Sequence, residues 1–200
     1  EHCLIAPVSV NGLTLFSAVG RMEDIVLDAD NTTLSPKEWF FPPTETLFAV
    51  ERKDGIAELV STPTNRGSII FGIRPCDALG LAILDKPFLA TPADAIYRQH
   101  RNLTILIGVA CSRACPECFC TSMGSAPDDA SHMDILLTQV GEAYAIKVVT
   151  EKGKALLASA TVKESEVPPA TPPSPAKVPT ENISPVMKRV IEAPYWSRLA

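Results

Sequence analysis

The sequence has few of the features that mark nucleic-acid-binding or membrane-spanning proteins. Lysine and arginine total 18 against 23 acidic residues, for a net charge of −5, and they form no basic patch. We therefore expect no nucleic-acid partner. No apolar run approaches the length of a membrane span, so we expect a cytoplasmic protein. The three histidines have no mutual spacing that suggests a metal site.

What the chain does have is cysteine, concentrated at two places. Cys76 follows the apolar run Ser68–Ile73, and four more cysteines follow the apolar run 103–110. These four are Cys111, Cys115, Cys118 and Cys120. Disulfides between cysteines so close in sequence would be strained. The pattern therefore indicates metal-bound thiolates in a reducing compartment.

The hydrophobic pattern predicts an α/β fold: a small mixed sheet with a parallel βαβ crossover, flanking β-hairpins and a proline-rich C-terminal tail. Asn11-Gly12 is a strong hairpin signal, and further hairpins are expected around residues 53–55 and Gly141. Helices are expected over residues 77–84, 93–101 and 151–160. The two buried strands and the helices between them imply a parallel crossover. Sites in such sheets lie beyond the carboxyl ends of the strands, where Cys76 and Cys111 fall.

The chain is expected to form one domain over residues 1–165. Its first part, residues 1–61, is rich in hairpins, and residues 68–160 form the core that carries the cysteines. Residues 166–200 contain a proline-rich stretch that can continue neither a helix nor a central strand. We predict an extended linker there, followed by a short amphipathic segment over residues 184–193.

Three kinds of cysteine site are compatible with this spacing. A [4Fe–4S] cluster needs four thiolates from loops, which Cys76, Cys111, Cys118 and Cys120 would supply, with Cys115 as the alternative to Cys76. Structural zinc also accepts four cysteines, but usually from two separated C-x-x-C pairs. Cys115-Pro-Glu-Cys118 is itself a C-x-x-C pair and could act as a redox dithiol. The cluster explains most of the pattern.

Four residues near these cysteines are candidates for the cofactor surroundings. Arg74 precedes Cys76 at the same strand end and would favour the reduced, more negative form of a cluster. Asp77 is expected in the first turn of a helix, where its charge suits the helix dipole. Ser122 and Gly124 leave room beside the cysteines. We expect no catalytic residue in this chain.

Several motifs, in order, resemble one family. Gly72-Ile-Arg-Pro-Cys-Asp77, Leu84-Asp-Lys-Pro-Phe88, Tyr97-Arg98, Cys111 and Cys118-Phe-Cys-Thr-Ser-Met-Gly124 resemble the iron–sulfur beta subunits of cytosolic sulfhydrogenases and their counterparts in anaerobic sulfite reductases. That family retains the cysteines matching Cys76, Cys111, Cys118 and Cys120. Its members usually continue into a two-cluster ferredoxin module, which these 200 residues do not contain.

The resemblance implies an electron carrier. Its partners would be a flavin-containing subunit that handles NAD(P)H and a catalytic redox subunit, of the hydrogenase or sulfite/sulfur reductase type. Two alternatives remain at this point. The chain could be a zinc-stabilised or metal-free assembly module, or a thiol-disulfide oxidoreductase.

Overall fold

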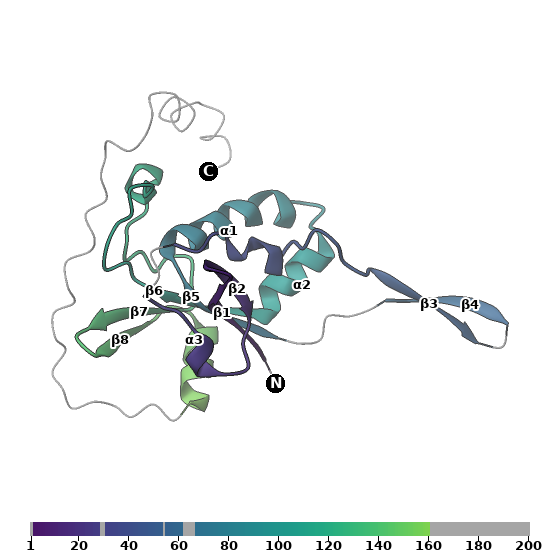
Figure 1. The fold of residues 1–200 in the computed structure, drawn as a ribbon. Coiled ribbons are helices and arrows are strands. Elements are labelled where there is room, and N and C mark those ends of the chain that lie inside the picture. Colours follow the sequence, from purple (N-terminus) through teal and green to yellow (C-terminus); the bar gives the residue numbers. More distant parts are fainter. Residues whose placement is uncertain (1, 29–30, 54, 62–66, 161–200) are drawn as a thin grey trace.

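The protein is described here from a computed structural model, which covers residues 2–28, 31–53, 55–61 and 67–160 (Figure 1). The expected linker and amphipathic segment between residues 166 and 200 lie outside the described residues. Within the described residues, no helix is both long and apolar enough to cross a membrane.

A six-stranded mixed sheet forms the centre of the α/β fold, in the order β2-β1-β5-β6-β7-β8. The neighbours β1, β5, β6 and β7 run parallel, and each edge strand is antiparallel to its neighbour. The strands are β1 (Cys3–Val10), β2 (Leu13–Ala18), β5 (Ser68–Ile73), β6 (Thr104–Val109), β7 (Ile135–Val140) and β8 (Ala143–Val148). The expected mixed sheet, its parallel crossover and its flanking hairpins are therefore confirmed.

Two helices connect β5 to β6. They are α1 (Pro75–Leu89) and α2 (Ala95–Leu103), and α2 begins where the Asp94 carboxylate accepts hydrogen bonds from the Ile96 and Tyr97 amides. α1 is longer than the predicted 77–84 and contains Pro87 in its last turn, although proline usually disrupts a helix interior. Packing explains the extra turn, because the centroid of the Phe88 ring lies 4.7 Å from the ring centroids of both Phe41 and Tyr97.

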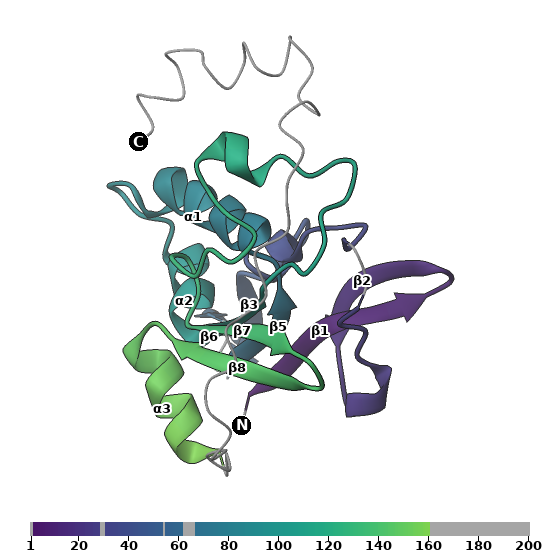
Figure 2. The same ribbon diagram turned by 90° about the vertical axis from the view of Figure 1, so that its left-hand side faces the viewer.

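The main core lies between the sheet and these two helices. Ile70 and Leu106 from the sheet meet Ala78, Leu81 and Tyr97 from the helices, and each of these side chains is at most 2% exposed. Figure 2 shows α1 and α2 on one side of the sheet and α3 (Glu151–Ser159) on the other. The sheet is therefore closed by helices on one face and only partly covered on the other.

A second, two-stranded sheet stands apart from this body. β3 (Phe48–Lys53) and β4 (Ile56–Ser61) form the hairpin expected around residues 53–55, and it extends away from the sheet and helices (Figure 1). We call it the arm. Its large apolar side chains are exposed, with Phe48 at 60% and Leu59 at 74%.

Candidate metal centre

The cysteines lie where two neighbouring parallel strands end. β5 ends at Ile73 and α1 begins two residues later, so Cys76 lies in the first turn of that helix. β6 ends at Val109, two residues before Cys111. The backbone holds this second end in place: the Ala110 amide bonds to Leu137 O at 2.9 Å, and the Cys111 amide bonds to Pro127 O at 2.9 Å.

These two strand ends open onto one cavity of about 400 Å³. Its lining contains four of the cysteines, and they are Cys76, Cys111, Cys118 and Cys120. Cys115 is absent from the lining and is buried, at 8% exposure. The tertiary structure thus gathers the four cysteines chosen as ligands around one space and places the alternative, Cys115, outside it.

The loop between β6 and β7 is shaped around the cysteine sulfurs. The Cys115 amide donates a hydrogen bond to the Cys118 sulfur at 3.2 Å, and the Cys118 amide bonds back to the Cys115 carbonyl at 3.0 Å. Cys120 begins a short 3-10 helix that ends at Met123. Gly124 follows with a φ of 76°, a left-handed conformation that suits glycine. Amide-to-sulfur bonds of this kind stabilise negative charge on the sulfur.

Burial and nearby negative charge raise the pKa of three of the cavity thiols, which disfavours their thiolate forms. The Cys76 residue is exposed on one side, but desolvation of its thiol by the surrounding protein raises the pKa to about 12, and negative charge on Asp77 and on the neighbouring cysteines adds to the effect. Burial also raises the pKa of the Cys111 and Cys120 thiols. The Arg74 guanidinium opposes the shift at Cys111. Four thiolates can share this cavity only if a cation compensates their charge.

The other candidate residues lie at different distances from the cavity. Asp77 lines it from the first turn of α1, and burial raises the pKa of its carboxyl. Arg74 lies behind it: its side chain donates to Leu27 O at 3.1 Å, and it shares an adjoining hollow of about 170 Å³ with Cys111. Ser122 and Gly124 belong to the turn after Cys120 and are not among the lining residues.

Two basic residues that the sequence did not single out also line the cavity, namely Lys37 and Arg113. The Lys37 side chain crosses α1 at Gly80, where a Cβ would lie 3.4 Å from Lys37 Cε. Lys37 comes from the 3-10 helix Pro36–Trp39, more than thirty residues before Cys76. No local spacing could have indicated it, because only the packing of that turn on α1 brings it near the cysteines.

The donor set fits a cluster in its chemistry, because thiolates are the usual ligands of iron–sulfur clusters. Within the described ranges, no three His, Cys, Asp or Glu side chains converge on a point that a single ion could occupy. In a [4Fe–4S] cluster each thiolate binds a different iron, so the ligands surround a space rather than meet at a point. Here four thiols line one cavity, and a backbone amide donates to one of the sulfurs.

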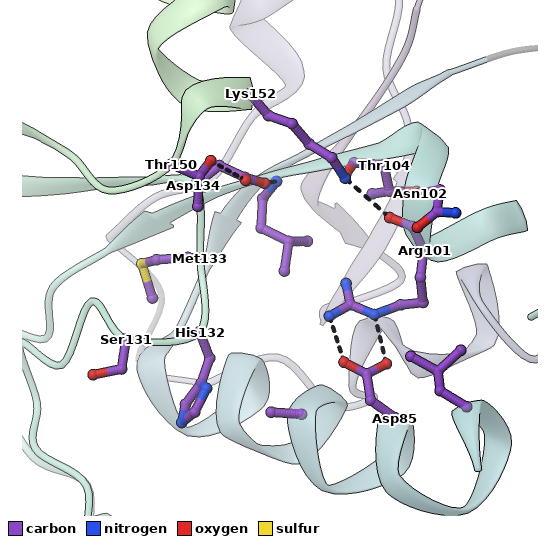
Figure 3. A pocket seen from close by; sticks show the side chains of 13 residues that line it. Asp85, Arg101, Asn102, Thr104, Ser131, His132, Met133, Asp134, Thr150 and Lys152 are labelled. Carbon is purple, nitrogen blue, oxygen red and sulfur yellow. Dashed lines mark hydrogen bonds and ion pairs between the residues drawn. The ribbon is translucent and has the colours of Figure 1, made fainter. Parts of the chain in front are cut away.

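A second hollow, of about 360 Å³, lies at the opposite ends of the strands (Figure 3). Two of its charged groups pair directly: Arg101 bonds Asp85 through two contacts of 2.7 Å, and the Tyr97 hydroxyl donates to the same carboxylate. Asp134 accepts from the Leu106 amide at 2.8 Å and from Thr150. These bonds tie α1 to α2, and the start of β7 to β6 and to the beginning of α3, so this hollow is a structural joint.

Comparison with known proteins gives one similarity of note. The chain is 30% identical over 151 residues to Sulfhydrogenase 2 subunit beta of Pyrococcus furiosus. The match covers 74% of this chain and 42% of that protein, so the chain spans less than half of its relative. No protein-family model matches the chain, and no solved structure matches it. The similarity confirms what the motifs of the sequence indicated, a resemblance to the sulfhydrogenase beta subunits.

Proposed function

We propose that this chain is an electron-transfer component that holds one [4Fe–4S] cluster on Cys76, Cys111, Cys118 and Cys120. The observation that supports it most is the cavity after β5 and β6, which those four cysteines line and Cys115 does not. When bound, a cluster would take up and release single electrons. The similarity to a sulfhydrogenase beta subunit supports the same function.

The residues of this chain would hold and tune the cluster without making or breaking bonds in a substrate. α1 would hold Cys76, and the hydrogen bond from the Cys111 amide to Pro127 O would hold Cys111 in place. The turn over residues 118–120 would supply the other two ligands, Cys118 and Cys120. The Cys115 amide places a donor on the Cys118 sulfur. Lys37, Arg74 and Arg113 bring positive charge to the surroundings, which favours the more negative reduced state.

The partners that we propose follow from the resemblance. Electrons would pass between a flavin subunit that handles NAD(P)H and a catalytic subunit of the hydrogenase or sulfite/sulfur reductase type. The cavity supports such a role because it opens toward solvent: Cys76 is exposed and Phe119, at its rim, is 42% exposed. A cluster near the surface can exchange electrons with a docked protein.

The ligand assignment is testable by single substitutions. Replacing Cys76, Cys111, Cys118 or Cys120 by Ser should abolish the broad visible absorption of anaerobically reconstituted protein and most of its iron and sulfide. Cys115→Ser should keep most of the cluster, because that thiol lies outside the cavity. Cys3→Ser, in β1, is the matched control and should keep all of it.

The outcome separates the competing functions. Zinc in place of iron and sulfide, bound by the same four cysteines, would identify a zinc-stabilised module. If Cys76→Ser kept the cluster and Cys115→Ser lost it, the fourth ligand would be Cys115 and not Cys76. A dithiol enzyme would instead show insulin-disulfide reduction that depends on Cys115 and Cys118 and needs no metal.

A further inference from the structure

The hydrogen-bonded ladder between β5 and β6 stops before it reaches Cys76 and Cys111. Its last pair joins Ile73 to Gly108, and each cysteine lies three residues further along the chain. A bulge at Gly72, whose φ is 83°, adds one residue to β5 opposite β6 and so shifts the end of that strand. The spacing between the two cysteines therefore depends on contacts beyond the ladder.

A segment from an earlier part of the chain, residues 25–28, lies beside β1. The Val26 amide donates a hydrogen bond to Pro7 O at 2.8 Å. An isolated antiparallel bridge joins Ile25 to Val8. We call residues 25–28 the bridging segment. It is anchored to the sheet, because β1 pairs with β5 as well as with β2.

Two arginine side chains join the bridging segment to the two strand ends. Arg74 donates to Leu27 O at 3.1 Å, and Arg113 donates to the next carbonyl, Asp28 O, at 2.7 Å. Each arginine lies two residues from one of the two cysteines. The same stretch of the segment also lines the hollow of about 170 Å³ behind Cys111. Both strand ends are thus fastened to two successive carbonyls of one segment.

The bulge in β5 leaves room for this segment. A Cβ on Gly72 would lie 2.9 Å from Leu27 Cδ2 and 3.1 Å from Pro7 Cδ, so any larger residue would push these side chains away. The positive φ at this position also favours glycine. The bridging segment is therefore held by close packing on the bulge and by the two arginine hydrogen bonds.

We propose that Arg74 and Arg113 are positioning residues that act through the bridging segment, keeping the two strand ends and the cysteines beside them at the spacing that a cluster requires. The proposal rests on the proposed function, because it concerns the ligands of that cluster. Each thiolate binds its own iron, so the cluster sets where the sulfurs must lie. Groups that orient metal ligands from behind typically change metal affinity about 10–100-fold.

Gly72→Ala tests the packing without changing any charge. Its Cβ should displace Leu27, so anaerobically reconstituted protein should lose iron to a chelator about tenfold faster than wild type. Gly12→Ala is the matched control, because Gly12 has a similar φ of 79° but a Cβ there would meet nothing within 4 Å. It should change the rate less than about twofold. Adding Leu27→Ala to Gly72→Ala removes the overlapping atom and should bring the rate to within about threefold of wild type.

A double substitution separates positioning from charge. Arg74→Gln and Arg113→Gln should each speed iron loss about fivefold, because either change releases the bridging segment. The double variant should be at most about twofold faster than the faster single variant, since both side chains act on one segment. Two independent charge effects would multiply instead, and that result would overturn the proposal.

The spacing itself can be measured without a cluster. In metal-free full-length chain whose other four cysteines are replaced by serine, a short bismaleimide should join Cys76 to Cys111. Gly72→Ala should slow this crosslink at least about fivefold, and Gly12→Ala less than about twofold. Equal crosslinking rates in the two variants would overturn the proposal. A wild-type chain that binds no cluster would contradict the proposed function, and the crosslink would still decide whether the bridging segment sets the spacing.

Discussion

At the scale of single residues, positive charge is the adjustable feature of the cysteine site. Lys37 lines the cavity, and Arg74 adjoins Cys111 from behind. A unit charge roughly 6 Å from a cluster is worth about 3 kcal/mol at an effective dielectric of about 20, before solvent screening. In the proposed cluster site, both side chains would therefore favour the reduced state.

Arg74→Gln and Lys37→Gln should each lower the midpoint potential, by tens of millivolts, because about 60 mV accompanies a tenfold change in a one-electron equilibrium. Electrochemical titration of reconstituted protein measures this, and the visible spectrum should show the cluster retained. Arg21→Gln is the control, since Arg21 pairs with Glu23 on the surface and is 75% exposed. Equal potentials in all three variants would mean that neither charge reaches the cluster.

At the scale of elements, α3 docks on β7 through a glycine. Gly153 lies in the first turn of α3, and its amide donates to the Thr150 hydroxyl at 3.2 Å. A Cβ at this position would overlap the Asp134 carbonyl oxygen and lie 2.9 Å from Ile135 Cγ1. The carbonyl belongs to the backbone of the sheet and cannot rotate aside as a side chain could.

Gly153→Ala should therefore destabilise the protein by about 1–3 kcal/mol, as overpacking does. The usual helix preference has the opposite sign, because alanine in place of glycine normally stabilises a helix by about 1 kcal/mol. Urea unfolding followed by circular dichroism measures the difference. Lys154→Ala, at the next and exposed position, should change the unfolding free energy by less than about 0.5 kcal/mol. A stabilised Gly153→Ala protein would show that α3 does not pack as described.

At the scale of the whole molecule, the arm is a surface apart from the core. The register puts Val50 opposite Leu59, next to Phe48, on one face, while Glu51 opposes Glu58 between Ile56 and Val60 on the other. An isolated two-stranded hairpin is marginal in water. Exposed apolar patches of this kind are sites of association.

Replacing Phe48 and Leu59 by Ser should reduce concentration-dependent light scattering of the purified protein and leave its thermal midpoint nearly unchanged, because both side chains are exposed. Replacing Glu51 and Glu58 by Gln, on the other face, should not reduce scattering. A large fall in thermal midpoint for the Ser variant would show that the arm is packed against the body. Wild-type protein that stays monodisperse at high concentration would remove the basis of this prediction.

Local signals in the sequence determined most of the secondary-structure elements. The continuous apolar run Ser68–Ile73 is β5 residue for residue, and the hairpin expected at Gly141 forms there. These succeed because strand periodicity and turn chemistry depend on neighbouring residues. The concentration of cysteines indicated soft-metal chemistry without any knowledge of the fold, and that chemistry stays a prediction.

Only the tertiary structure decided which side chains meet. It extended α1 through Pro87 by packing Phe88 on two rings, placed Cys115 outside the cavity, and brought Lys37 to it from a distant turn. It also fastened residues 25–28 to the two arginines beside the cysteines, which the strand sequences alone could not show. The reason is common to all four: contacts between elements depend on how whole faces pack, and that packing involves residues far apart in the chain.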